Sequence, residues 1–208
     1  MIEDIVDRNG FSYVDLGLPG GTLWATMNVG ASKPSDYGLY FQWGDIQGYK
    51  FNQVGKDKGQ KAFTWDDYKW SINGNSKNLN KKYIILGKSL EPEDDAAHVH
   101  MGGEWHIPSP DQIWELLDNT ISEWSELDGI SGVKITSKKD NSKSIFFPAA
   151  GYAKNGTLDY CKRVGSIWSS RLSSNTIRYG QQFYFLSEKI SLNSYARYCG
   201  FSVRGVIG

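Results

Sequence analysis

Short runs of β-forming residues dominate the first part of the chain. Two such runs, 13–18 and 22–29, lie on either side of the tripeptide Pro19-Gly20-Gly21. Hydrophobic runs that flank a short Pro/Gly turn are typical of a β-hairpin. A third run, YGLYFQWG over 37–44, is aromatic and contains glycines that bound it. We therefore expect a hairpin followed by one more strand.

Residues 46–88 have a different character. This stretch is rich in lysine and contains polar clusters such as NGNSKNLNKK. Because few aliphatic residues interrupt it, we expect a long surface excursion with one short strand over 82–86. Trp65 and Trp70 in this excursion have two interpretations, an exposed aromatic site or a small satellite core. We favour the satellite core.

End signals predict a first helix in the segment EPEDDAAHVHMGG. Pro92 suits the first helical position, and the acidic residues after it favour the positive end of a helix. Gly102 and Gly103 are expected to end this helix.

A second helix is predicted to begin after Ser109. Ser109 is an N-cap, Pro110 takes the first helical position, and Gln112 completes a capping box. The apolar residues that follow share one face at spacings of three and four, which suits packing on a sheet. They are Ile113, Leu116 and Leu117.

The rest of the chain returns to β-forming runs. After Thr120 we expect short strands over 132–136, 144–148 and 165–169, a hairpin over 181–190 that turns at Ser187-Glu188, and a last strand over 201–206. Strands, two helices and then further strands predict an α+β fold. The length of 208 residues suits a single domain over 1–208.

Composition excludes several classes of protein. Hydrophobic residues make up 39% of the chain and aromatic residues 14%, which is too apolar for disorder. No run approaches the roughly 20 apolar residues of a membrane span. The polar N-terminus predicts no signal peptide. The 23 basic and 23 acidic residues cancel, so we expect no general attraction to nucleic acid or to an anionic membrane.

Charge is nevertheless uneven along the chain. Residues 161–208 contain seven basic residues and one acidic residue, so this segment carries a net charge of +6 and the remainder carries −6. Two interpretations are open. A positive end neutralises a negative body within one fold, or the segment forms a binding face that prefers acidic partners.

Seven short phrases occur in a fixed order along the chain. They are YVDLGLPGGTLWATMNVGA (13–31), YGLYFQWGD (37–45), EPEDDAA (91–97), GGEWHIPSPDQIWELL (102–117), SIFFPAAGY (144–152), GSIWSS (165–170) and RYCGFSVRGV (197–206). In this order they resemble the bacterial major paralogous (FISUMP-type) domain, which belongs to the formylglycine-generating-enzyme-like branch of the C-type lectin fold. The resemblance implies a C-type-lectin-like fold, with two helices and mainly antiparallel short strands. It also implies five core tryptophans, which are Trp24, Trp43, Trp105, Trp114 and Trp168.

The segment from about 165 to 204 resembles the variable region of target proteins of diversity-generating retroelements. In such proteins a reverse transcriptase mutates adenines, so scattered positions change while the scaffold between them is kept. The resemblance implies a scaffold that includes Trp168, Phe183, Phe185, Arg197 and Arg204. Nine positions between scaffold residues are candidate ligand-binding positions. They are Tyr184, Leu186, Ser191, Asn193, Ser194, Tyr195, Ala196, Tyr198 and Cys199.

Strand alternation gives most of these positions a common face. Phe183 and Phe185 share one face of a strand, so Tyr184 between them lies on the other. In the last expected strand Phe201 and Val203 face the core. Alternation from these residues exposes Tyr198 and buries Cys199, unless a β-bulge shifts the alternation. We expect one exposed ligand-binding surface. Its members are Tyr184, Ser191, Asn193, Tyr195 and Tyr198, with Arg171, Arg178 and Arg197 nearby to add specificity for acidic groups.

Catalytic chemistry finds little support in the sequence. Enzymes of the resembled branch bind copper through two closely spaced cysteines, whereas Cys161 and Cys199 lie far apart. We therefore expect no enzymatic activity, no metal site and no cofactor. A disulfide between these two cysteines is an alternative. The three histidines, His98, His100 and His106, are expected to be structural.

An acidic cluster in the sequence is a candidate calcium site. Glu91, Glu93, Asp94 and Asp95 carry the hard oxygen ligands that calcium prefers. Their position at the start of a helix favours the other interpretation, in which they stabilise the helix N-terminus.

These patterns predict a noncatalytic ligand- or receptor-binding protein that recognises a protein or a glycan through its C-terminal face, without nucleic-acid binding or membrane insertion. The resemblance implies a retroelement-diversified variable protein, on a phage virion or a bacterial cell surface. A fixed structural or adhesive module of the same family is the alternative. A formylglycine-generating-type oxidase is the third candidate.

Overall fold

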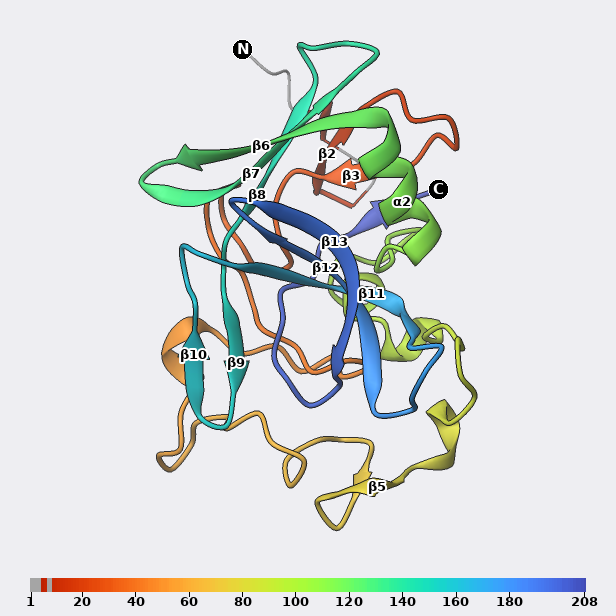
Figure 1. Ribbon diagram of the computed structural model, residues 1–208, viewed down its shortest axis with the longest axis vertical. Helices are drawn as coiled ribbons and strands as arrows, with labels where there is room; N and C mark the ends of the chain where they lie inside the picture. Colours follow the sequence, from red (N-terminus) through yellow and green to blue (C-terminus); the bar gives the residue numbers. More distant parts are fainter. Residues whose placement is uncertain (1–4, 7–8) are drawn as a thin grey trace.

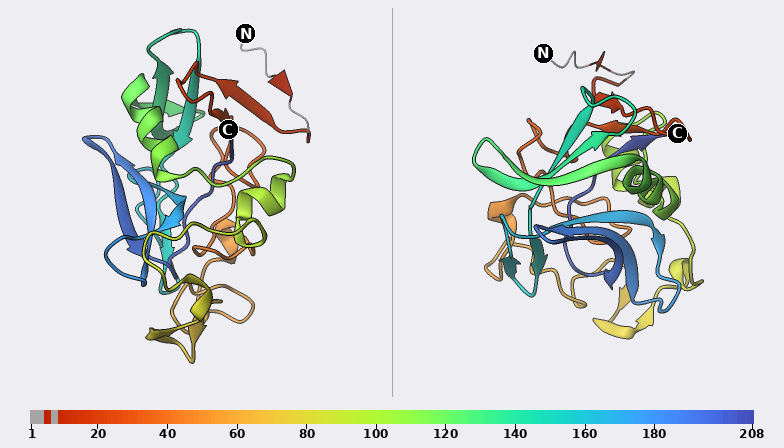
Figure 2. Two further views of the ribbon diagram at one scale, coloured as in Figure 1. Left: turned by 90° about the vertical axis from the view of Figure 1, so that its right-hand side faces the viewer. Right: turned by 45° about the horizontal axis from the view of Figure 1, so that its top comes forward.

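Small antiparallel sheets and two α-helices form the part of the chain that the computed structural model describes, residues 5–6 and 9–208 (Figure 1). The first sheet joins both ends of the chain, in the order β1 (Ile5–Val6), β2 (Ser12–Asp15), β3 (Leu23–Ala25) and β14 (Val206–Ile207). A second sheet contains β6 (Thr120–Leu127), β7 (Ile130–Ser137) and β8 (Ser144–Pro148). Figure 2 shows β14 beside the N-terminal strands. The chain is therefore α+β, as its order of elements predicts.

The third sheet carries the C-terminal segment. It contains β11 (Gly165–Leu172), β12 (Tyr179–Leu186) and β13 (Lys189–Ala196). Two ribbons lie outside these sheets, β9 (Tyr152–Lys154) with β10 (Thr157–Asp159), and β4 (Ser71–Ile72) with β5 (Asn75–Leu79). The helices are α1 (Ala96–Met101) and α2 (Pro110–Asn119), together with the short 3₁₀ turns η1 (Phe51–Gln53), η2 (Lys81–Tyr83) and η3 (Pro92–Asp94).

Three local predictions from the sequence are confirmed. β2 and β3 form the expected antiparallel hairpin, in which Val14 lies opposite Trp24. β8 spans the expected residues, and β12 and β13 form a hairpin that turns at Ser187-Glu188. Each of these elements has a signal in its own residues, a turn or an alternation, so local interactions are sufficient to specify it.

Helix α2 begins as its capping box predicts. The backbone N–H of Gln112 donates to Ser109 Oγ (3.2 Å), and the backbone N–H of Ser109 donates to Gln112 Oε1 (2.9 Å). Ile113 and Leu116 are fully buried, and Leu117 is half-buried against the same cluster.

Trp114 departs from its expected place in the core. Its side chain is 48% exposed. One residue along a helix turns the side chain by about 100°, so Trp114 points away from the face that buries Ile113. The other four tryptophans that the resemblance places in the core are buried, and they are Trp24, Trp43, Trp105 and Trp168.

The first predicted helix is broken into two pieces. Asp95 has an extended backbone (φ −89°, ψ 111°) between η3 and α1. Its carboxylate accepts from the backbone N–H of His98 (2.9 Å) and of Ile107 (2.8 Å), so it caps a new helix and also fixes the following loop. Asp95 therefore acts as an N-cap, and the helix starts at Ala96 instead of Pro92.

Other β predictions are wrong in detail. Residues 82–86 form no strand, because η2 occupies their start. Residues 37–44 and 201–206 contribute mostly isolated bridges, such as Phe41 with Phe201 and Ile167 with Ser202. Each bridge pairs one residue with a different partner segment. Most aromatic residues of these segments are therefore buried in the core without forming long β-ladders.

The excursion over 46–88 is more deeply buried than its composition predicts. Phe63, Tyr68, Trp70 and Tyr83 are all buried, and Trp65 is half-buried. Tyr68, Trp70 and Tyr83 belong to the main core cluster together with Trp43 and Trp168. The predicted satellite core around Trp65 and Trp70 is thus part of the central core.

The face of α2 provides a first test of this packing. Leu116→Ala should lower the free energy of unfolding by about 2–5 kcal/mol, because it leaves a cavity under the helix. Ser109→Ala should cost about 1 kcal/mol through loss of the cap. Asp118→Asn, at an exposed position of the same helix, is the control and should change stability by no more than about 0.5 kcal/mol. Urea unfolding measures all three, and a near-zero cost for Leu116→Ala would contradict the packing.

Candidate ligand-binding site

The register of the β12–β13 hairpin turns five of the nine candidate positions away from the core cluster around Phe183 and Phe185. Phe183 pairs with Leu192 and Phe185 with Ile190, and these four side chains pack in one core cluster. Directly paired residues of an antiparallel ladder project to the same face. The opposite face therefore carries the other pairs, which are Tyr184 with Ser191, Gln182 with Asn193, and Gly180 with Tyr195.

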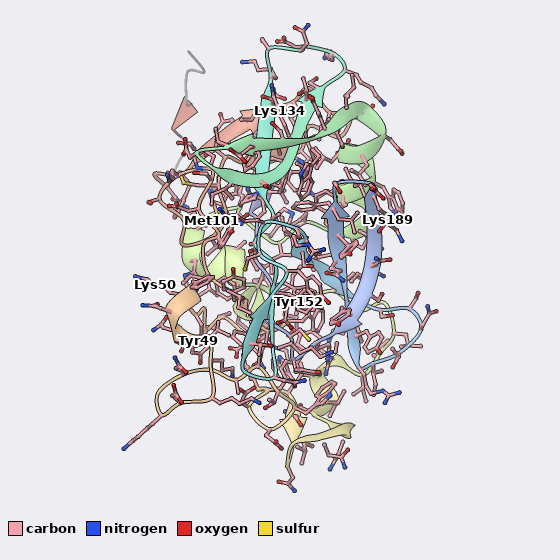
Figure 3. All side chains as sticks on the ribbon, turned by 60° about the vertical axis from the view of Figure 1, so that its left-hand side comes forward. Tyr49, Lys50, Met101, Lys134, Tyr152 and Lys189 are labelled. Atoms are coloured by element: carbon pink, nitrogen blue, oxygen red, sulfur yellow. The ribbon has the colours of Figure 1, made fainter. Side chains whose placement is uncertain are left out.

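An open cavity of about 600 Å³ lies on this opposite face. Five of the nine candidate positions line it, and they are Tyr184, Leu186, Asn193, Ser194 and Tyr195. We call it the central cavity. Further lining comes from Tyr152, Tyr160, Val164, Ser166, Gln182, Lys189 and Phe201. Figure 3 labels Tyr152 on β9 and Lys189 on β13, so the walls come from separate elements.

Aromatic contacts anchor the walls of the central cavity to the core. The ring centroid of Tyr195 lies 5.8 Å from that of Tyr152 and 5.7 Å from that of Phe201. Phe201 in turn stacks on the buried Trp168 at 4.1 Å. Burial raises the pKa of the Tyr152 phenol, so this hydroxyl is neutral at physiological pH. The cavity therefore has rigid, uncharged aromatic walls.

Tyr195 also lines a second cavity beside the central one. This side cavity has a volume of about 270 Å³ and includes Ala196 and Tyr198 among its lining residues, together with Trp65, Lys154, Arg178 and Tyr179. Lys154 Nζ donates to Tyr195 Oη (3.4 Å). Seven of the nine candidate positions thus line two adjoining cavities.

The predicted exposure of Tyr198 is wrong. Its side chain is only 9% exposed, because its ring packs against Trp65 with the ring centroids 5.0 Å apart. Trp65 comes from the excursion. Alternation within the C-terminal segment therefore cannot predict that Trp65 covers Tyr198. Tyr198 forms a wall of the side cavity instead of part of an open surface.

The two remaining candidate positions lie away from the cavities. Cys199 is fully buried, which is what alternation predicts without a bulge. Ser191 is half-buried opposite Tyr184, and its Oγ has no hydrogen-bond partner among the residues that the structure describes. Neither side chain lines the central or the side cavity.

Both cysteines are free. Burial raises the pKa of the Cys199 thiol to about 12 and also raises that of Cys161. The thiolate is the form that binds metals and attacks disulfides, so both side chains are poorly suited to such chemistry at neutral pH. The alternative of a disulfide between them is not realised in the structure.

The three arginines expected near the surface have different roles. Arg178 is exposed and lines the side cavity. Arg171 forms an ion pair with Asp111 of α2, with Nη2 and Oδ2 2.8 Å apart. Arg197 is fully buried, where its Nη1 donates to the carbonyl of Tyr83 (2.9 Å), so it is a core residue and contributes nothing to surface specificity.

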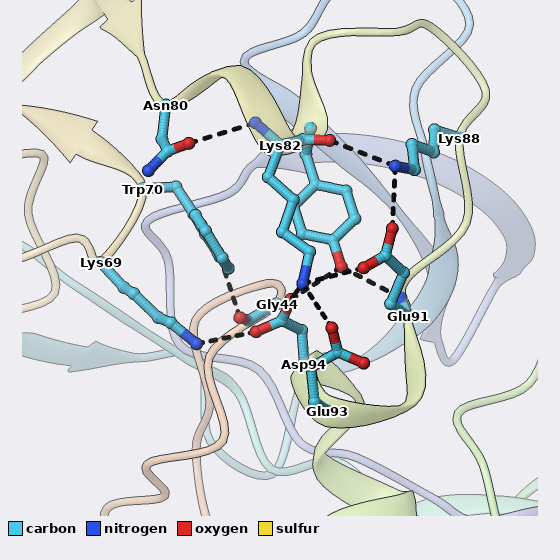
Figure 4. Close-up of polar contacts among 10 residues, drawn as sticks. Gly44, Lys69, Trp70, Asn80, Lys82, Lys88, Glu91, Glu93 and Asp94 are labelled. Carbon is cyan, nitrogen blue, oxygen red and sulfur yellow. Dashed lines mark hydrogen bonds and ion pairs between the residues drawn. The ribbon is translucent and has the colours of Figure 1, made fainter.

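The acidic cluster converges on a lysine (Figure 4). Lys82 Nζ lies 2.9 Å from Glu91 Oε2, 2.8 Å from Glu93 Oε1 and 2.6 Å from Asp94 Oδ2. Lys88 pairs with Glu91 (3.0 Å), and Lys69 pairs with Asp94 (2.8 Å). Glu91, Glu93 and Asp94 mainly tie η2 to η3, which corrects the expectation that they stabilise a helix N-terminus. Asp95 is the exception, because it caps α1 as that expectation predicts.

The histidines have backbone partners. His98 Nδ1 lies 3.2 Å from the carbonyl of Trp105, His100 Nε2 lies 2.9 Å from that of Ile46, and His106 Nδ1 lies 3.0 Å from that of Glu104. Among residues 5–6 and 9–208, no group of three His, Cys, Asp or Glu residues is arranged to hold a metal ion. No helix in this part of the chain has the length and apolarity needed to cross a membrane.

A third cavity continues the central one toward β10 and β11. Both cavities share Tyr160, Val164, Tyr184 and Leu186 as lining residues. The third cavity, which we call the basic cavity, has a volume of about 410 Å³ and adds Lys162 and Arg163. The three cavities therefore form one continuous face over β9, β12, β13 and the loop between β10 and β11.

Part of this face is not predicted by the sequence. Tyr152, Tyr160 and Phe201 line the central cavity but are not among the nine candidate positions. Gln182 shares the outward parity of Tyr184, which is the one sequence signal for its place in the cavity. The contribution of β9 depends on how the chain folds back, which no local pattern encodes.

Comparisons with models of protein families, with curated proteins and with solved structures find no significant match to this chain.

The ion-pair cluster predicts a specific pH dependence of stability. Hydrogen bonds from Lys82 and then Lys88 lower the pKa of Glu91 from 4.5 to about 2. A carboxyl group with a lowered pKa in the folded state stabilises the protein above its unfolded pKa, and this contribution is lost as the pH falls toward the folded pKa. Glu91→Gln should therefore be less stable than the parent at pH 7, and the difference should shrink between pH 4.5 and pH 2.

Urea unfolding at several pH values measures this difference. Glu123→Gln, at an exposed position of β6, is the control and should follow the parent at every pH. A Glu91→Gln difference that stays constant down to pH 2 would show that the ion pairs do not stabilise the fold.

Proposed function

We propose that this chain is a noncatalytic ligand- or receptor-binding protein that recognises a protein or a glycan through its C-terminal face, on a C-type-lectin-like fold. We further propose that it is a retroelement-diversified variable protein. The observation that carries the proposal is the clustering of the candidate positions. Seven of nine positions selected from the sequence line two adjoining cavities on one face.

The burial of the scaffold residues supports this proposal. Trp168, Phe183 and Phe185 are buried in the core clusters, and so are Arg197 and Arg204. Four lining positions lie outside the core clusters, so their substitution leaves the core contacts intact, and they are Tyr184, Leu186, Asn193 and Ser194. Tyr195, Ala196 and Tyr198 also pack with a core cluster. A surface that tolerates many side chains on a constant core is what diversification of a binding protein requires.

The chemistry of the lining residues suits recognition. Tyrosines offer large contact areas at a low entropic cost, and small polar residues such as Asn193 and Ser194 supply adaptable hydrogen bonds. A fixed adhesive module of the same family would use the same cavities without variation. An oxidase would need a reactive thiolate, which the raised pKa values of Cys161 and Cys199 disfavour. The context we favour is a phage virion or a bacterial cell surface.

Genomic sequence provides the direct test of diversification. We expect a near-copy of the 3′ end of the gene beside a reverse-transcriptase gene. Differences between the two copies should fall at template adenines, in the codons of Tyr184, Leu186, Asn193, Ser194, Tyr195, Ala196 and Tyr198. A gene without such a near-copy, or differences spread evenly over the segment, would favour the fixed adhesive module instead.

Tolerance to substitution tests the same proposal in the purified protein. Tyr184→Ser and Asn193→Ser change lining residues of an open cavity, so each should alter the free energy of unfolding by less than about 1 kcal/mol. Phe183→Ser, the matched change on the opposite face of β12, should cost at least about 3 kcal/mol because it opens a core cavity and buries a hydroxyl. Equal costs on both faces, measured by urea unfolding, would contradict a variable face on a constant core.

A further inference from the structure

A buried amide without a partner lies at the central cavity. Gln182 is only 3% exposed, yet it lines this cavity, and its Oε1 has no hydrogen-bond partner within the described chain. Buried polar atoms in folded proteins are nearly always hydrogen-bonded, since desolvation without a bond is unfavourable. A ligand that donates a hydrogen bond inside the cavity satisfies this atom.

The walls around Gln182 suit a ring with an apolar face. Tyr152, Tyr160, Tyr184 and Tyr195 line the cavity, and the negative faces of aromatic rings attract the partially positive C–H groups of a sugar. The volume of about 600 Å³ lies within the range of roughly 300–1,000 Å³ that is typical of small-ligand sites. A sugar ring combines such C–H faces with hydroxyl groups around its whole edge.

The rim of the face is basic. Five basic residues line the three cavities, and none of the lining residues is acidic. The five are Lys189 at the central cavity, Lys162 and Arg163 at the basic cavity, and Lys154 and Arg178 at the side cavity. The acids adjacent in sequence, Asp159 and Glu188, line none of the cavities, and Asp159 accepts from Thr157 Oγ1 (3.2 Å).

Four of these five basic side chains are exposed to a ligand, and Lys154 is half-buried beside Tyr195. Within residues 5–6 and 9–208, none of the five forms an ion pair with an acidic side chain. Clustered charges of one sign attract ligands of the opposite sign and speed their association. The unpaired positive rim therefore selects an anionic ligand.

We propose that this face binds an anionic cell-surface glycan. One sugar ring enters the central cavity, stacks on Tyr184 or Tyr195 and donates a hydroxyl to Gln182 Oε1, while acidic groups of neighbouring sugars lie at Lys189 and Arg163. The inference rests on the proposed function, because it names the ligand class of the same face. An acidic protein loop also matches the rim, but it lacks a compact ring of hydroxyls that reaches a recessed amide.

A glycan array tests the ligand class directly. The full chain should bind glycans that carry uronic acid, sialic acid or sulfate, and it should bind their neutral counterparts at least about tenfold more weakly. The affinity for the best glycan, measured by titration calorimetry, should fall as NaCl is raised, since exposed charges are screened. An array without any bound glycan, binding of neutral glycans alone, or binding of an oligoglutamate peptide in place of glycans would each overturn the proposal.

Variants test the two parts of the site. Gln182→Met preserves the shape of the side chain and removes the unpartnered amide, so the free energy of unfolding should stay equal or rise while glycan affinity falls about tenfold. Lys189→Gln should weaken binding and flatten its salt dependence. Lys143→Gln is the matched control, since Lys143 is exposed between β7 and β8 and lines none of the three cavities. Parent-like affinity of Gln182→Met would overturn the role of the amide.

The outcomes also separate this inference from the proposed function. A blank glycan array together with a near-copy of the 3′ end beside a reverse transcriptase would reject the ligand class and leave diversification standing. An anionic glycan bound through Gln182 without such a near-copy would support the ligand class on a fixed adhesive module.

Discussion

A single buried guanidinium holds the separate sheets of this protein to its C-terminal segment. Arg204 is fully buried, and burial lowers its pKa to about 9. Its Nε donates to Asn28 Oδ1, its Nη1 to the carbonyl of Ala25 and its Nη2 to that of Phe146, each at 2.9 Å. Burying such a group without these acceptors is very unfavourable, so the stability of the closed core depends on all three partners. They come from β3, the loop after β3 and β8, which are thereby fixed to one point.

Arg197, seven residues earlier, holds the excursion over 46–88 to the C-terminal segment. Its guanidinium lies 5.4 Å from the ring centroids of both Trp43 and Tyr68, and its Nη1 reaches the carbonyl of Tyr83. Cation–π contacts of this kind partly replace the hydration that a buried cation loses. The segment 197–204 therefore has a buried arginine at each end, and the bridges of Phe201 and Ser202 fix the residues between them. This rigid segment contributes Phe201 to the central cavity.

The separation of core from face follows from this arrangement. β12 turns Phe183 and Phe185 into the core and Tyr184 outward, and the stacked pair of Trp168 and Phe201 supports Tyr195 from below. Tyr184, Asn193 and Ser194 on this face lie outside the core clusters, so their identity is available for recognition. Tyr195 and Tyr198 also pack in the core. The basic rim, the tyrosine walls and the recessed amide of Gln182 come together on this face.

Local signals in the sequence determined the elements that depend on neighbouring residues. The capping box at Ser109, the turn between β2 and β3, and the alternation in β12 and β13 each involve interactions between neighbours along the chain or within one hairpin, and the structure contains all of them. Most of the candidate face was predictable for the same reason, because side-chain direction follows from parity. Only the tertiary structure decided the burial of Tyr198 under Trp65, the convergence of three carboxylates on Lys82, and the walls that Tyr152 and Tyr160 add. These contacts join segments far apart in the chain, and the path that brings such segments together is set by the whole core and not by any local pattern.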